Sequence, residues 1–217
     1  MSQFVFVPGL LCTDALFPAQ FQAFRGIAEV RTADTLGMSS IDEMAEKLLD
    51  EISGPFALLG FSMGGYVALE VARRAADRLT GLALVSTSAQ PDTEEKRKQR
   101  QGLVELSQIG KFKGVTPRLL PRFFSPDALQ DEAKTSIAIK SGEAVGKDNF
   151  ILQQQAIMGR RDQRPFLPSF AKPSIVICGK LDVLTPPDHA TEMANLLPNS
   201  RLHLLETKQI TNGWCTI

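Results

Sequence analysis

The segment that most constrains the fold is LLGFSMGGYVALEVARR, residues 58–74. A short apolar run ends at Gly60, a serine follows at position 62, and a helix-forming run begins directly after it. Residues 60–64 match the pattern G-x-S-x-G in the strand–turn–helix context that displays a nucleophilic serine. Glycines at positions 60 and 64 suit this context because the strand and the helix must pass close to one another. The segment therefore predicts a strand, a sharp turn that carries Ser62, and a helix.

Strand-like and helix-like segments alternate on both sides of this turn. The expected strands are residues 3–9, 28–34, 55–61, 79–89, 173–182 and 200–206. Amphipathic helices lie between them, and one of these begins with a capping box formed by Ser40 and Glu43. Such alternation predicts an α/β fold, with a mostly parallel sheet covered by helices on both faces and joined by right-handed crossovers.

The alternation is interrupted between Pro91 and Pro165, where the pattern is helical and polar. We interpret residues 91–165 as a helical cap insertion, and residues 1–90 together with 166–217 as the core domain. The insertion follows the fourth expected strand, so it should lie over the carboxyl edge of the sheet. Ligands of open α/β sheets bind at that edge.

Composition disfavours several kinds of partner. The 24 lysines and arginines balance the 24 aspartates and glutamates, so net charge gives no support for a nucleic-acid partner. No apolar run approaches the roughly 18 residues that suggest a membrane span, and the start MSQFVFVPG lacks the pattern of a signal peptide. The cysteines at positions 12, 178 and 215 have no metal-like spacing and fit a reducing compartment. We therefore expect a cytoplasmic protein without a metal or membrane partner.

A serine nucleophile needs hydrogen-bond donors for the negative charge that develops on the substrate oxygen. The N–H of Met63 is one candidate, because it lies at the positive end of the expected helix. The second should come from the loop VPGLLCTD after the first strand, where the N–H of Leu10 is the candidate, with Leu11 behind it. The alternative interpretation of this loop is a Pro-Gly pair that only ends the strand.

Four segments, VPGLLCTDALF, LLGFSMGGYVALEVA, RDQRP and PSIVICGKLDVLTPPDHATEMANLLP, resemble the α/β-hydrolases of the short, cap-bearing esterase and lactonase type. The resemblance runs from Phe4 to about Glu206 and implies an α/β-hydrolase fold, a small-molecule acyl substrate and no cofactor. It also implies that Asp182, just after the strand that follows the cap, is the catalytic acid that orients a histidine. Two alternatives stay open: Asp182 as a surface residue that caps a turn, and Asp92 as a fallback acid.

The histidine of such a triad follows the acid in chain order and belongs on the loop after the last strand. The sequence holds two histidines, His189 and His203. His203 lies inside the last expected strand, about 10 Å from the catalytic edge at about 3.3 Å per residue. His189 lies on the first turn of the helix after Asp182, and we interpret it as a solvated residue of the helix surface. Residues 207–217, TKQITNGWCTI, contain no histidine and are interpreted as an atypical ending of the kind a frameshift or early stop produces.

Two functions are therefore compatible with the sequence. The first is a serine hydrolase acting on carboxylic esters, lactones or related acyl compounds, with activity impaired because neither histidine stands at the expected position. The second is a non-catalytic small-molecule binding protein that keeps the same fold. Haloalkane dehalogenases and epoxide hydrolases are disfavoured, because those relatives carry aspartate where this chain has Ser62.

Overall fold

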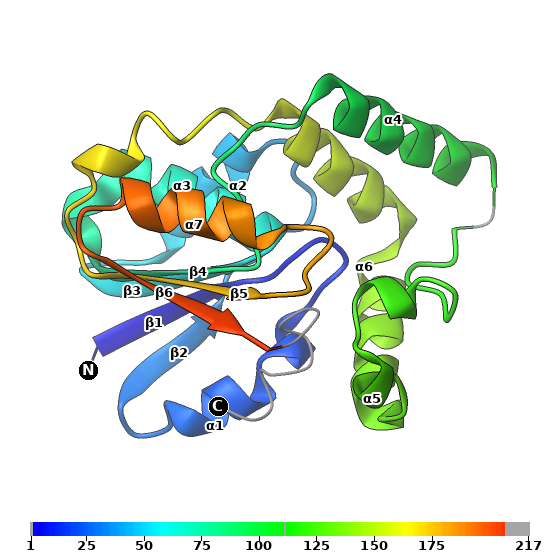
Figure 1. Ribbon diagram of the computed structural model, residues 1–217, viewed down its shortest axis with the longest axis horizontal. Helices are drawn as coiled ribbons and strands as arrows, with labels where there is room; N and C mark the ends of the chain where they lie inside the picture. Colours follow the sequence, from blue (N-terminus) through cyan, green and yellow to red (C-terminus); the bar gives the residue numbers. More distant parts are fainter. Residues whose placement is uncertain (1, 111, 207–217) are drawn as a thin grey trace.

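In the part of the chain that the structure describes, the sheet contains six strands in the order β2-β1-β3-β4-β5-β6, and every neighbouring pair is parallel (Figure 1). The computed structural model describes residues 2–110 and 112–206. The strands are β1 (Ser2–Val7), β2 (Ala28–Thr32), β3 (Phe56–Phe61), β4 (Leu79–Val85), β5 (Ser174–Gly179) and β6 (Ser200–Leu205). All six strands expected from the sequence are present, so the predicted α/β class is confirmed. The prediction that the fourth strand runs to residue 89 is wrong, because Ser86 has a φ of 43° and leaves the extended conformation there.

Helices flank the sheet on both sides. On one side lie α2 (Ile41–Glu51), α3 (Met63–Ala75) and α7 (Pro187–Leu196), and on the other lie the short helices η1 (Asp14–Leu16) and α1 (Pro18–Ala23). Side chains alternate along each strand. Val5 and Val7 accordingly belong to the core under α2, α3 and α7, whereas Phe6 packs with Phe17 and Phe21 on the other face.

Between β4 and β5 the described chain is helical. Its elements are α4 (Glu94–Ile109), η3 (Leu120–Arg122), α5 (Pro126–Leu129), α6 (Glu132–Gly159) and η4 (Leu167–Ser169). A further short helix, η2 (Ala76–Arg78), lies just before β4. In Figure 1 helices α4, α5 and α6 lie beyond the end of the sheet toward which the arrow of β6 points. We keep the division into a core and a cap at residues 91–165 as a prediction.

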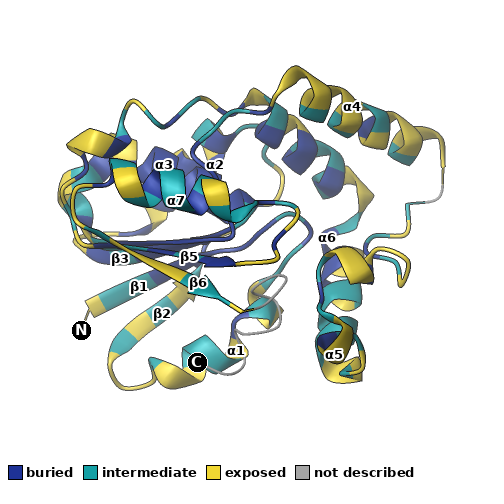
Figure 2. Cartoon of the chain, viewed as in Figure 1, coloured by how far each residue is buried: buried dark blue, intermediate teal, exposed yellow. Residues whose placement is uncertain are grey.

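Burial is greatest in the middle of the molecule. Figure 2 shows that α3 and the central strands are mostly buried, whereas α4 exposes its outer side. Helix α2 begins with the expected capping box, in which Ser40 Oγ accepts from the Glu43 N–H at 3.1 Å and Glu43 Oε2 accepts from the Ser40 N–H at 3.2 Å. Among the helices in the described part of the chain, none combines the length and hydropathy of a membrane-spanning segment.

Candidate active site

Ser62 lies on a strained turn between β3 and α3. Its backbone has φ 52° and ψ −116°, a conformation that costs a non-glycine residue on the order of 1–3 kcal/mol. Three hydrogen bonds hold it: its N–H donates to the Val85 carbonyl at 2.9 Å, and its carbonyl accepts from the Gly65 N–H at 2.9 Å and from Thr87 Oγ1 at 2.8 Å. Met63 follows as the first residue of α3, so its N–H has no acceptor within the helix.

Glycines allow the chain to pass close to itself around this turn. A Cβ atom on Gly60 would lie 2.4 Å from the Gly64 carbonyl oxygen, and one on Gly64 would lie 2.0 Å from the Val7 carbonyl oxygen. The close passage expected from the sequence at positions 60 and 64 is therefore confirmed. Gly65 meets the same constraint, because a Cβ there would lie 2.2 Å from Thr87 Oγ1.

The loop after β1 lies directly beside Ser62. It forms a turn that is closed by a hydrogen bond of 3.1 Å from the Cys12 N–H to the Gly9 carbonyl, with Leu10 as its second residue. A Cβ atom added to Gly9 would lie 3.2 Å from the Cβ of Ser62, so the turn and the serine are in contact. The structure thus brings Leu10 into the neighbourhood of Ser62.

Asp182 follows β5 and is buried, with 3% of its surface exposed. Its Oδ1 accepts from the N–H groups of Leu184 and Thr185, each at 2.9 Å, and its Oδ2 accepts from Thr185 Oγ1 at 2.9 Å. These three bonds fix the carboxylate in place. They also show that Asp182 caps the turn after β5, as the alternative interpretation held, but its expectation of a surface residue is wrong because Asp182 is buried. A capping bond does not prevent a second role. Ser62 and Asp182 follow the carboxyl ends of β3 and β5, and because these strands are parallel, both residues lie at the same edge of the sheet.

Asp92, the fallback acid, lies in a buried ion cluster. Its carboxylate forms ion pairs with Arg100 Nε and with Arg160 Nη1, each at 2.8 Å, and its side chain is fully buried. The guanidinium of Arg160 also lies 4.2 Å from the centre of the Tyr66 ring, a distance typical of a cation–π contact. Two arginines therefore hold this carboxylate at the boundary between the sheet and helices α4 and α6.

The two histidines lie on different elements. His203 is exposed in β6 and pairs in register with Ile177 of β5, as expected for a strand residue. His189 lies in the first turn of α7 and is half-buried, so the expectation of a solvated side chain is wrong. Burial, reinforced by the charge of Lys96, lowers the pKa of His189 below 6.5. Its Nδ1 is buried and has no hydrogen-bond partner among the residues that the structure describes.

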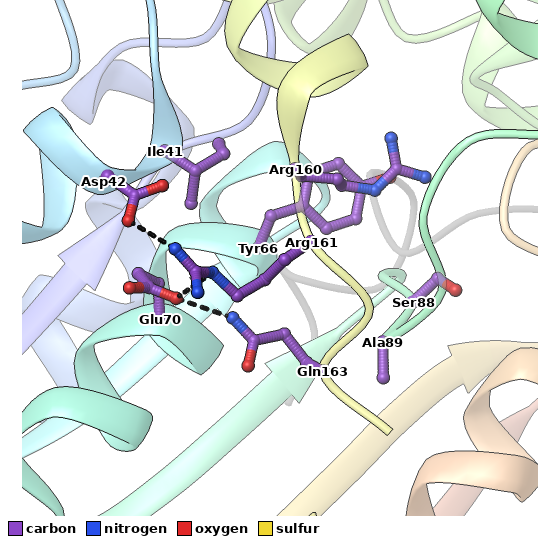
Figure 3. Close-up of a pocket in the computed structure, with 9 residues that line it drawn as sticks. All are labelled: Ile41, Asp42, Tyr66, Glu70, Ser88, Ala89, Arg160, Arg161 and Gln163. Carbon is purple, nitrogen blue, oxygen red and sulfur yellow. Dashed lines mark hydrogen bonds and ion pairs between the residues drawn. The ribbon is translucent and has the colours of Figure 1, made fainter. Parts of the chain in front are cut away.

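A second charged cluster joins α3 to the chain just after α6 (Figure 3). The buried Glu70 carboxylate pairs with Arg73 and Arg74 at 2.6 and 2.7 Å and with Arg161 at 3.2 Å, and it accepts from Gln163 Nε2 at 2.8 Å. Burial acts to raise the pKa of Glu70, but the hydrogen bonds from its neighbours outweigh it and lower the pKa to about 2. The cavity beside these residues measures about 10 Å³, about the space that one water molecule needs. It is therefore too small for a substrate.

Cys178 is buried, with 1% of its surface exposed, and burial followed by the charge of Asp182 raises the pKa of its thiol to about 12. Burial also raises the pKa of Cys12 to about 12. Both thiols are therefore protonated at neutral pH, and neither competes with Ser62 as a nucleophile. Cys215 and the interpretation of residues 207–217 as an atypical ending lie outside the described residues.

A parallel sheet with a serine held at positive φ between a strand and a helix defines the class of α/β proteins that carry a nucleophile elbow. A family model described as alpha/beta hydrolase fold matches residues 22–208. The chain belongs to this family, and the resemblance seen in the sequence is confirmed.

Two relatives of similar sequence carry the same enzyme name. The chain is 27% identical over 185 residues to the pimeloyl-acyl-carrier-protein methyl ester esterase of Photobacterium profundum, covering 76% of this chain and 67% of that protein. It is 28% identical over 176 residues to the enzyme of the same name from Nitrosomonas europaea, covering 77% of this chain and 69% of that protein.

Two solved structures share the fold. An esterase from Thermogutta terrifontis has a TM-score of 0.85 at 22% identity, covering 99% of this chain and 84% of that chain. The enol-lactonase from Burkholderia xenovorans LB400 has a TM-score of 0.85 at 22% identity, covering 97% of this chain and 85% of that chain.

Sequence reasoning missed two residues that touch this site. Thr87 holds the Ser62 carbonyl, and Gln153 of α6 accepts a hydrogen bond from the turn that contains Leu10. The sequence carries a signal for the second, because three glutamines, Gln153, Gln154 and Gln155, interrupt the otherwise apolar run of residues 150–158. Glutamines in such a run predict buried polar contacts.

Proposed function

We propose that this protein is a serine hydrolase that cleaves carboxylic esters, lactones or related acyl compounds. The observation that carries the proposal is the conformation of Ser62, at φ 52° and ψ −116° between β3 and the first residue of α3. Strain of this kind persists where surrounding contacts enforce it, and it clusters at functional sites. The two similar relatives and the two solved structures described above are three esterases and a lactonase, and this supports acyl compounds as the substrate class.

In the proposed reaction, Ser62 Oγ attacks the carbonyl carbon, and the N–H groups of Leu10 and Met63 stabilise the negative oxygen. The hydroxyl proton passes to the departing alkoxide as the carbon–oxygen bond breaks, and an acyl-serine forms. Water then hydrolyses the acyl-serine, which releases the acid and restores Ser62. Each oxyanion donor contributes about 3–4 kcal/mol to lowering such a barrier.

We further propose that Asp182 is the acid, and that the 217-residue chain turns over slowly. In this family the acid orients a histidine that carries the proton from the serine to the leaving group. His203 lies exposed in β6, and His189 lies on α7 rather than on the loop after the last strand. Neither position is the one from which a histidine serves this proton transfer.

Covalent labelling tests the nucleophile. A fluorophosphonate should modify the purified chain at Ser62, located by mass spectrometry of the peptide, and Ser62→Ala should abolish the labelling. Ser107→Ala, which changes a half-buried serine of α4, is the matched control and should label like the wild type. Equal labelling of Ser62→Ala and the wild type would remove Ser62 from the role. No labelling, together with reversible binding of an ester analogue, would favour the non-catalytic binding protein.

Chemical rescue tests the missing base. General-base catalysis typically contributes about 10²–10⁴-fold, so added imidazole should raise the hydrolysis of p-nitrophenyl acetate by about tenfold or more. Ser62→Ala measured under the same conditions supplies the rate of the direct reaction with imidazole. If the wild type gains no more from imidazole than Ser62→Ala does, the proposal of a missing base is wrong. A fast basal rate that His189→Ala abolishes would assign the base to His189.

A further inference from the structure

A glutamine from α6 contacts the turn that carries the proposed oxyanion donor. Gln153 Oε1 accepts a hydrogen bond of 3.1 Å from the Leu11 N–H, across 142 residues of sequence. Gln153 is fully buried, so it makes this contact away from solvent. The neighbouring Gln154 faces a different partner, because its Oε1 accepts from Arg100 Nη1 at 2.8 Å.

The turn adopts a conformation that leucine does not favour. Leu11 is the third residue of the turn from Gly9 to Cys12, and its φ is 58°. A positive φ at this place is the mark of a type II turn, which usually has glycine there, whereas the commoner type I turn has φ near about −90°. Rotating the peptide between Leu10 and Leu11 interconverts the two forms. Something outside the turn must therefore favour the form with positive φ.

The Leu11 N–H belongs to that same peptide. In the observed form it points at Gln153, and a buried N–H without an acceptor costs about 1–3 kcal/mol. The hydrogen bond to Gln153 therefore stabilises the turn with positive φ, and rotation of the Leu10–Leu11 peptide would break it. The side chain of Leu11 is also buried, in an apolar cluster with Phe124, Val145 and Phe150 of the segment between β4 and β5.

Further polar contacts fix α6 against the loops at this edge of the sheet. Gln153 Nε2 lies 3.4 Å from Thr35 Oγ1, and one turn earlier Asn149 Oδ1 accepts from the Gly37 N–H at 2.8 Å. Thr13 Oγ1 lies 3.1 Å from Ser141 Oγ, which joins the loop after β1 to the earlier part of α6. The acceptor of Gln153 is thus held at a fixed place relative to the turn.

We propose that Gln153 is a positioning residue, which holds the oxyanion turn in its form with positive φ through the Leu11 N–H and thereby keeps the preceding residue, Leu10, in place. The inference rests on the proposed function, because it assigns Leu10 as an oxyanion donor. Placing a catalytic group demands an accuracy of about 0.5 Å, and a turn that exchanged between its two forms would not hold Leu10 to that tolerance. Gln153 also links the packing of α6 to the chemistry at Ser62 without touching the substrate.

Hydrogen exchange in the unmodified chain gives the first test. The Leu11 amide should exchange at least about 100-fold more slowly than an unprotected amide, as measured by NMR or by mass spectrometry of the peptide that contains it. Exchange as fast as that of a solvent-exposed amide would overturn the proposal. This measurement needs no enzymatic activity, so it stands apart from the proposed function.

Three variants give the second test. Gln153→Met keeps the length of the side chain but removes the acceptor, so it should speed exchange of the Leu11 amide about tenfold or more and slow the maximal rate of Ser62 labelling by about 10–100-fold. The concentration of fluorophosphonate giving half that rate should change less than about threefold. Gln153→Glu keeps an acceptor and should restore most of the rate. Gln154→Met, which leaves the turn untouched, is the matched control.

The outcomes separate the two levels of the proposal. If Gln153→Met labels like the wild type, or Gln154→Met slows labelling equally, Gln153 has no positioning role. If Gln153→Met fails to fold, the exchange rate of the Leu11 amide in the wild type and in Gln153→Glu decides instead. A Leu11 amide that loses its protection in Gln153→Glu contradicts the proposal. If wild-type Ser62 is never labelled while Leu11 is protected in a Gln153-dependent way, the proposed function fails and the structural role of Gln153 stands.

Discussion

Backbone strain among single residues is concentrated at one edge of the sheet. In the described ranges 2–110 and 112–206, the residues other than glycine with positive φ are Leu11, Ser62 and Ser86. They follow β1, β3 and β4, so all three lie at the carboxyl edge. Two of them belong to the proposed oxyanion turn and nucleophile. The third starts the loop that supplies Thr87, whose hydroxyl holds the Ser62 carbonyl.

Glu70 should make stability depend on pH. Its pKa is lowered from 4.5 to about 2 in the fold, so its ionisation stabilises the native state above pH 4.5, and this contribution is lost as the pH falls toward 2. The shift corresponds to at most about 3 kcal/mol at about 1.4 kcal/mol per pKa unit. Urea unfolding at pH 7, 4 and 3 should show falling stability in the wild type. Glu70→Gln should be less stable at pH 7 and should lose less between pH 4 and 3. An equal slope in both proteins would contradict this role.

At the scale of elements, the sequence predicts each strand because apolar runs of the right length end in turn residues. It also predicts the capping box of α2, which depends only on residues close in sequence. Contacts between distant elements were not predictable in this way, because no local pattern shows that Gln153 reaches Leu11 or that Arg161 reaches Glu70. The same holds for the candidate site. Ser62 is predictable because it lies in a local motif, whereas the ion pairs of Asp92 are not, because its partners come from two different places in the segment between β4 and β5.

Helix α6 contains a break in its backbone at Gly146. Gly146 has φ 76° and ψ 174°, far from helical values, and a Cβ atom there would meet nothing within 4 Å. Gly146→Ala should therefore destabilise the fold through its backbone alone, by about 1 kcal/mol. Gly102, inside α4 and also without neighbours within 4 Å, is the matched control, and Gly102→Ala should stabilise by about 0.5–1 kcal/mol. Urea unfolding would measure both, and a change of the same sign in the two variants would contradict the assigned break.

At the scale of the whole molecule, buried charges join the sheet to the helices beyond its edge. Asp92 follows β4, and its two partners are Arg100 on α4 and Arg160 just after α6. Arg160 Nε also donates to the Gln90 carbonyl at 2.9 Å. The placement of α6, and with it the acceptor that Gln153 presents to the oxyanion turn, therefore depends on a cluster that lies away from that turn.

Removing the shared carboxylate should loosen this junction. Asp92→Ala leaves two arginines largely buried without a counter-ion, so it should destabilise the protein by about 3–5 kcal/mol. Asp162→Ala is the matched control, because its 2.6 Å pair with Arg164 is about one third exposed, and it should cost at most about 1 kcal/mol. Hydrogen exchange of Asp92→Ala should accelerate first in α4 and the later half of α6, while β3 and α3 stay protected. Uniform acceleration through all elements would show that Asp92 supports the core as a whole rather than this junction.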